Sequence, residues 1–290
     1  MVQTTGDGDQ REVRLAEGGI RYREAGSGPP IVFVHGLLVN GLLWRKVIPE
    51  LAGDFRCVVP DWPLGSHEIP MAADADLSPP GVARLIARFL DALDLDRVTL
   101  VGNDTGGALC QLVATRHPER LARLVLTPCD AHENFLPPLF RPLQWAARVP
   151  GAIYALTRPM RIHALRRLPV GFGLLAKREI DSAITDAYLA PVLSRRDIRR
   201  DVERFLSGIS NRYTLEAARR FADFRKPVLL AWAPEDRVFD LRHAERMADA
   251  FPDARLERIE DSYTFVPEDQ PRRTAELIAG FVRESSAGAS

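Results

Sequence analysis

Short apolar runs rich in β-branched residues alternate along the chain with longer segments in which apolar residues recur every three to four positions. The short runs predict strands at residues 31–34, 56–59, 98–101, 124–126 and 228–232. The helical period predicts helices at residues 81–90, 107–116 and 244–250. Strands that are apolar throughout are typical of a parallel sheet buried on both faces. The pattern therefore predicts an α/β fold with a mostly parallel central sheet and helices on both of its faces.

Two segments depart from this alternation. Residues 13–25 alternate between polar and apolar positions around a Gly-Gly pair, which predicts an antiparallel hairpin leading into the sheet. Residues 131–221 combine helical periodicity with many arginines and prolines and contain no convincing strand. Because strand and helix alternate again afterwards, we interpret this segment as a helical cap inserted into one core, formed by residues 12–130 and 222–283. Residues 1–11 and 284–290 are expected to be disordered.

The charge and the cysteine content of the chain indicate which partners and which cellular compartment to expect. The chain has 290 residues, with 39 Lys plus Arg and 39 Asp plus Glu. A net charge of zero gives no overall field to attract nucleic acid or an anionic membrane, so neither is an expected partner. Three cysteines without a CxxC spacing favour buried free thiols, and the polar N-terminus lacks the apolar core of a secretory signal. We expect a soluble cytoplasmic protein whose partner is a small molecule; the sequence does not give the oligomeric state.

The strongest chemical signal lies where the predicted strand at 98–101 meets the predicted helix at 107–116. The segment between them has glycines on both sides of Asp104, two positions away at Gly102 and Gly106. A strand that reverses into a helix within a few residues strains the central residue and requires small neighbours. This is the pattern of a nucleophile elbow, with Asp in the usual serine position.

Four further motifs accompany the elbow: the His-Gly turn at 35–36, the Asp-Trp-Pro-Leu-Gly-Ser loop at 61–66, the His-Pro-Glu-Arg-Leu link at 117–121 and the strand end at 232–236. With these five motifs in order, the chain resembles the α/β-hydrolase superfamily over about residues 12–283. Within that superfamily it resembles the Asp-nucleophile branch, which includes haloalkane dehalogenases and epoxide hydrolases. The resemblance implies an α/β-hydrolase fold with no metal or organic cofactor.

The resemblance also assigns roles to residues near the elbow. Asp104 is expected to be the nucleophile, and the backbone N–H groups of Leu37 and Thr105 to form the oxyanion hole. The acid of the catalytic triad has two candidates, Asp236 after a late strand and Asp130 before the cap. Haloalkane dehalogenases bind the halide with side-chain N–H donors at the positions of Leu37 and Thr105, and neither residue has such a donor.

The chain lacks the histidine that serves the family as general base. Thr264 stands at its position, and no histidine follows His243. Threonine has no accessible pKa near neutrality and does not deprotonate water, so an ester formed on Asp104 would persist. His67, after the 61–66 loop, is the candidate replacement base that lies nearest by topology, and His132 at the root of the cap is the second.

Five cap aromatic residues are candidates for the walls of an apolar pocket above Asp104: Phe135, Phe140, Trp145, Phe172 and Tyr188. Substrate contacts are predicted for His35, Trp62, Phe135, Trp145 and Thr264. The favoured activity is hydrolysis of a carbon–heteroatom bond in a small or medium apolar molecule, with a non-standard base. Two alternatives remain open: a lyase, isomerase or cyclase that uses Asp104 for proton transfer, and a catalytically silent binder of small molecules.

Overall fold

The computed structural model describes residues 9–169 and 171–287 and contains one eight-stranded sheet in the order β1-β2-β4-β3-β5-β6-β7-β8. The strands are β1 (Asp9–Leu15), β2 (Gly18–Ala25), β3 (Pro30–Val34), β4 (Arg56–Pro60), β5 (Val98–Asp104), β6 (Leu121–Cys129), β7 (Val228–Trp232) and β8 (Ala254–Arg258). The first two strands form an antiparallel hairpin, β2 pairs antiparallel with β4, and the others pair in parallel. The predicted fold class and hairpin are confirmed.

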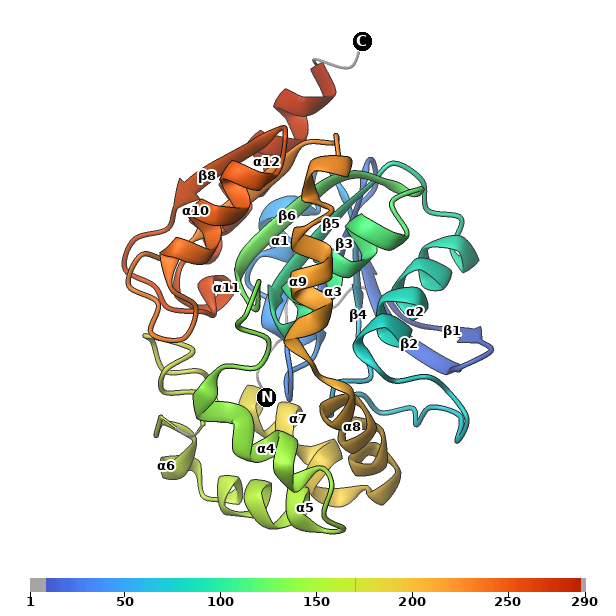
Figure 1. Cartoon of the computed structure of the whole chain (residues 1–290), viewed down its shortest axis with the longest axis vertical. Coiled ribbons are helices and arrows are strands. Elements are labelled where there is room, and N and C mark those ends of the chain that lie inside the picture. The colour runs from blue at the N-terminus through green and yellow to red at the C-terminus, as the bar shows by residue number, and fades with distance from the viewer. Residues whose placement is uncertain (1–8, 170, 288–290) are drawn as a thin grey trace.

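Helices cover both faces of the sheet and fill the segment between β6 and β7 (Figure 1). The α-helices are α1 (Ile48–Leu51), α2 (Pro79–Ala92), α3 (Thr105–Arg116), α4 (Arg141–Ala146), α5 (Ala152–Thr157), α6 (His163–Arg166), α7 (Ser182–Ser194), α8 (Arg196–Gly208), α9 (Asn211–Ala218), α10 (Leu241–Ala250), α11 (Val266–Asp269) and α12 (Pro271–Ala287). The single-turn 3-10 helices are η1 (Gly41–Trp44), η2 (Pro138–Phe140), η3 (Arg158–Arg161) and η4 (Phe221–Asp223).

The core follows from the apolar runs. Every residue of β5 is buried, and so is α3 from Thr105 to Thr115, because this strand and helix lie in the middle of the molecule. Helices α4 to α8 lie together at one end of the molecule in Figure 1, whereas α9 packs against α3. The division of the chain into a core and a cap at residues 131 and 221 stays a prediction.

The ends of the chain differ from the prediction. Residues 9–11 belong to β1, where they pair with Tyr22 to Glu24, and residues 284–287 continue α12. Predicted disorder at these positions was therefore wrong, because pairing with β2 and packing of α12 on the core order them. The rest of the two predicted disordered segments lies outside the described residues. No described helix is both long enough and apolar enough to span a membrane.

The three cysteines, Cys57, Cys110 and Cys129, are free and buried. Burial raises the pKa of the Cys57 thiol to about 12. It raises the pKa values of Cys110 and Cys129 well above the ordinary thiol value. All three therefore remain protonated at neutral pH.

Candidate active site

The site is built on a strained turn between β5 and α3. Asp104 ends the strand at φ 55° and ψ −134°, a region that residues other than glycine rarely adopt. The turn needs small neighbours: a Cβ atom on Gly102 would lie 2.7 Å from Cys110 Sγ, and one on Gly106 would overlap the carbonyl oxygen of Val34. The strained elbow expected from the sequence is therefore present.

The Asp104 carboxyl group is buried beside the turn that follows β3. The backbone N–H groups of Leu37 and Thr105 both approach it and lower its pKa, but desolvation is the larger effect. The nearby Asp236 raises the pKa further, and the result is a pKa of about 7. Near neutral pH, Asp104 is thus divided between its carboxylate and its carboxylic acid.

Asp130 is a second buried carboxyl group beside the elbow. Its Oδ2 accepts a hydrogen bond from Thr105 Oγ1 at 3.1 Å, and its Oδ1 accepts one from the Leu136 N–H at 2.9 Å. Burial and the nearby charge of Asp104 raise the Asp130 pKa well above its ordinary value. Asp130 therefore favours its protonated form more than an exposed aspartate does, and it holds the Thr105 hydroxyl beside the turn.

Asp236 lies in the loop after β7. Its Oδ1 accepts hydrogen bonds from the N–H groups of Val238 and Phe239, at 2.7 and 2.8 Å. Desolvation raises its pKa to about 6; the two N–H groups and the nearby Thr264 hydroxyl oppose that rise. Asp236 is therefore mostly a carboxylate at pH 7.

Thr264 occupies the loop between β8 and α11 and is fully buried. Neither Thr264 Oγ1 nor Asp236 Oδ2 has a hydrogen-bond partner of normal geometry among the described residues. The Thr264 carbonyl accepts a hydrogen bond of 2.7 Å from Asn103 Nδ2, which also donates to Thr127 Oγ1 at 2.8 Å. Asn103 thus ties this loop to the elbow, a role that sequence analysis missed because a single amide has no distinctive local pattern.

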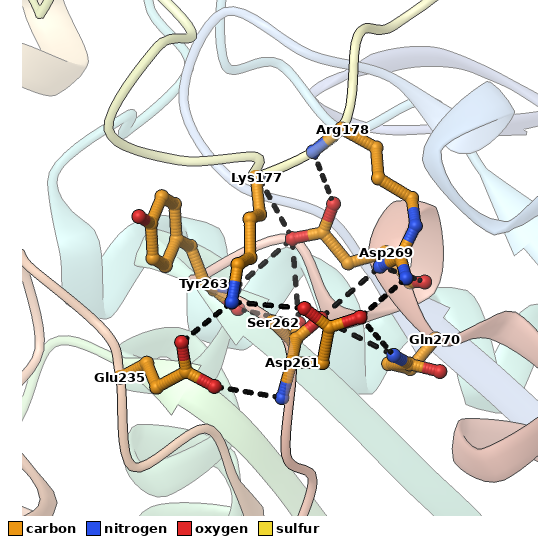
Figure 2. Close-up of polar contacts among 8 residues, drawn as sticks. All are labelled: Lys177, Arg178, Glu235, Asp261, Ser262, Tyr263, Asp269 and Gln270. Atoms are coloured by element: carbon orange, nitrogen blue, oxygen red, sulfur yellow. Dashed lines mark hydrogen bonds and ion pairs between the residues drawn. The ribbon is translucent and has the colours of Figure 1, made fainter.

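A cluster of charged residues fixes the loops that carry Asp236 and Thr264 (Figure 2). Asp269 is buried and accepts hydrogen bonds from the backbone N–H groups of Lys177, Arg178 and Tyr263, at 2.8 to 3.0 Å. The Lys177 ammonium group bonds to Glu235 at 2.6 Å and to Asp261 at 2.8 Å. Segment 177–178, before α7, is therefore bound to both loops.

An apolar cavity of about 90 Å³ lies above Asp104. On the scale where one water needs about 10–15 Å³, it has room for a small organic molecule. Asp104 and Thr105 lie at its floor. The other lining residues are apolar apart from Thr157: Leu37, Leu38, Leu136, Pro137, Phe140, Leu143, Leu156, Met160, Gly171, Phe172, Leu175 and Leu189.

The structure does not bring the two candidate histidines to this cavity. His67 is buried against α8, where its Nε2 lies 3.3 Å from Asp201 Oδ2. His132 stacks on His243 with 5.9 Å between ring centroids, and burial lowers its pKa to about 4. The prediction of His67 as the replacement base was therefore wrong, and so was the alternative, His132.

His35 and Trp62, which were predicted to contact the substrate, instead have a structural role. His35 Nε2 accepts a hydrogen bond from the Trp62 N–H at 2.8 Å, and Trp62 Nε1 donates to the Phe33 carbonyl at 3.1 Å. Burial lowers the His35 pKa to about 4, so its ring is neutral. Neither side chain lines the cavity, and both brace the turn that presents Leu37.

The predicted aromatic wall is also only partly present. Phe140 and Phe172 line the cavity, but Phe135 packs into the core and Trp145 is 65% exposed. Trp145 faces outward because Leu143, two positions earlier on the same helix, faces the cavity. Thr264 is close to Asp236 but is not part of the lining.

Comparisons with known proteins place this site in a family. A family model described as "alpha/beta hydrolase fold" matches residues 29–271. The chain belongs to this family.

Two relatives and one solved structure illustrate the similarity. Haloalkane dehalogenase 2 of Mycobacterium tuberculosis is 29% identical over 273 residues, which is 91% of each chain. A cis-3-alkyl-4-alkyloxetan-2-one decarboxylase of Shewanella oneidensis is 27% identical over 279 residues, 92% of this chain and 86% of that protein. An alpha/beta hydrolase fold protein from Burkholderia ambifaria has the same fold, with a TM-score of 0.79, 24% identity, and 96% and 98% of the two chains covered. The predicted class, a hydrolase of the α/β-hydrolase superfamily similar to haloalkane dehalogenases, is confirmed.

Proposed function

We propose that the protein hydrolyses a carbon–heteroatom bond in a small apolar molecule, with Asp104 as the nucleophile. The observation that carries this proposal is the position of Asp104, a carboxyl group on a strained turn, at the floor of an apolar cavity and beside two backbone N–H groups. Similarity to haloalkane dehalogenase 2 over 91% of both chains supports the same class of reaction.

In the first step the Asp104 carboxylate attacks the substrate carbon and displaces the heteroatom, which leaves an ester on Asp104. In the second step water attacks the ester carbonyl carbon. The developing negative charge on the carbonyl oxygen is stabilised by the N–H groups of Leu37 and Thr105. Collapse of this intermediate restores Asp104 and releases the product alcohol.

The base in the second step is Asp236 in this proposal. Its carboxylate is close enough to Asp104 to raise the Asp104 pKa, and its own pKa of about 6 leaves it ionised at pH 7. Asp236 Oδ2 and Thr264 Oγ1 are both buried, and neither has a hydrogen-bond partner of normal geometry among the described residues. A water bound by these two oxygens would give its proton to Asp236, and Asp236 would return that proton to the leaving alkoxide.

The site offers fewer hydrogen-bond donors to the leaving group than a haloalkane dehalogenase does. The Thr105 hydroxyl donates to Asp130, and the Leu37 side chain is aliphatic. No tyrosine is among the described lining residues, so the cavity also lacks the phenol donors of an epoxide hydrolase. The assay should therefore cover alkyl halides and epoxides together.

Mass spectrometry of the protein and of its proteolytic peptides, after incubation with these compounds, tests the proposal. We expect a covalent mass on the Asp104 peptide that is transient in the wild-type protein and persists in Asp236→Asn, because that variant forms the ester without a base to hydrolyse it. Asp104→Asn should show neither adduct nor product. If no adduct and no turnover occur with either compound class, the result counts against Asp104 as the nucleophile, and the proton-transfer enzyme and the silent binder become the better hypotheses.

A second candidate is a non-hydrolytic reaction in which Asp104 transfers a proton. Two observations favour it: the Asp104 pKa of about 7, which suits a proton donor or acceptor, and the similarity to the oxetanone decarboxylase. Reaction in ¹⁸O-labelled water separates the two. Ester hydrolysis places the label in the Asp104 carboxyl group after one turnover, whereas proton transfer leaves both Asp104 and product unlabelled.

A further inference from the structure

The exposed large apolar side chains of the described residues all lie in one segment, 139–168. They are Leu139, Trp145, Val149, Leu156, Ile162 and Leu168, each between 43% and 65% exposed. The segment includes α4, α5 and α6, which lie together at the lower end of the molecule in Figure 1. Exposed apolar side chains are normal where they occur singly, but six of them within one segment of 30 residues point to an interaction site.

The same part of the chain is strongly basic. Residues 134–178 contain eight Lys or Arg and no Asp or Glu, although the whole chain has a net charge of zero. Arg141, Arg148, Arg158 and Arg161 are exposed, and no ion pair is recorded for them among the described residues. We call these four arginines and the six exposed apolar residues the basic apolar surface.

We propose that the basic apolar surface docks on an anionic lipid bilayer, a partner that the zero net charge of the whole chain does not favour but this local basic segment does. Interfacial proteins combine exposed Trp and aliphatic side chains, which enter the headgroup region, with arginines that bind anionic lipids, and this surface offers both. Leu156 is 44% exposed and also lines the cavity above Asp104, so the surface reaches the candidate active site. An apolar substrate dissolved in the lipid would then reach the cavity without crossing water.

Other occupants fit less well. Two copies of this chain docked symmetrically through the surface would place arginines against arginines. Nucleic acid would satisfy the arginines but would leave the aliphatic side chains without contacts, because bases stack on aromatic rings.

Trp145 provides a direct test. The other three tryptophans, Trp44, Trp62 and Trp232, are fully buried, so quenching by an aqueous quencher reports on Trp145 alone. We expect vesicles of phosphatidylcholine with phosphatidylglycerol to shift the Trp145 emission to the blue, protect it from the quencher and sediment the protein. Vesicles of phosphatidylcholine alone, or high salt, should reduce binding by at least about tenfold.

Paired charge reversals supply the control. Arg148→Glu with Arg158→Glu should weaken binding by about tenfold or more, whereas Arg14→Glu with Arg272→Glu, both exposed on β1 and α12, should leave it unchanged. Val149→Ser with Ile162→Ser should weaken binding while the secondary structure stays intact by circular dichroism. Asp104→Asn should bind like wild type, so failure of the proposed chemistry does not affect this assay.

Three results would overturn the proposal. The first is absence of binding to the anionic vesicles, and the second is equal weakening by the two pairs of charge reversals. The third is a concentration-dependent dimer in analytical ultracentrifugation that Trp145→Ser abolishes, since the surface would then be an interface between two copies.

Discussion

Asp104→Asn should stabilise the protein at alkaline pH and have little effect at acidic pH. Each tenfold change in proton affinity is worth about 1.4 kcal/mol, so the rise of the Asp104 pKa from 3.8 to about 7 corresponds to about 4 kcal/mol. The folded protein binds this proton more tightly than the unfolded chain does. The contribution of Asp104 to the free energy of unfolding is therefore greatest below pH 4 and falls as the pH rises from 4 to 7; above pH 7 this contribution stays at its lower value.

Asparagine is neutral and close to aspartic acid in shape, so it removes the buried charge and keeps the packing. Urea unfolding of both proteins at pH 4.5 and pH 8 measures the effect as the difference between variant and wild type. We expect the variant to gain about 4 kcal/mol at pH 8 but only about 1 kcal/mol at pH 4.5, because pH 4.5 is already slightly above the unfolded pKa of 3.8. An equal difference in the free energy of unfolding at the two pH values would refute the argument that desolvation raises the pKa of the Asp104 carboxyl group.

Asp236→Asn is the matched comparison, because the Asp236 pKa of about 6 corresponds to about 3 kcal/mol. The free energy of unfolding that Asp236→Asn gains should reach its full value by about pH 6. This is one pH unit lower than for Asp104→Asn. If both variants gained stability over the same pH range, the assignment of the two pKa values would be wrong.

Three further predictions concern the reaction and the loops around it. The rate of adduct formation should rise with pH and level off above about pH 7, as Asp104 ionises; a flat profile from pH 5 to 9 would exclude its carboxylate as the nucleophile. Thr264→His should supply a general base of higher pKa than Asp236 and speed ester hydrolysis by about 100-fold or more, whereas Thr264→Val should not; no gain from a folded Thr264→His protein would show that the strength of the base does not limit turnover. Asp269→Asn should lower the free energy of unfolding in urea by about 2 kcal/mol, because an amide cannot accept all the hydrogen bonds that the buried carboxylate accepts; an unchanged free energy would mean that the charged cluster does not hold these loops.

The sequence predicted those features that depend on local pattern. The apolar runs located β3 to β7, and the glycines at 102 and 106 located the strained turn at Asp104. Strand β8 (Ala254–Arg258) was missed, because it is a polar edge strand without a continuous apolar run.

Long-range pairing explains the errors in the site. The role of His67 depends on Asp201, which lies 134 residues later and meets it only after α8 has packed on the core. Whether Trp145 faces the cavity depends on how α4 rotates about its own axis, and one short helix with apolar residues on more than one side does not determine that rotation. Local periodicity contains neither kind of information.

The burial of the three cysteines means that an electrophile can be used to label Asp104 without first reacting with a thiol. Alkylating agents normally react first with thiolates, and Cys57, Cys110 and Cys129 are inaccessible in the folded state and stay protonated because of their raised pKa values. In the native protein an electrophile therefore meets little competition from thiols. A modification that appears only after denaturation would report on the thiols, so the same reagent distinguishes chemistry at the elbow from loss of the fold.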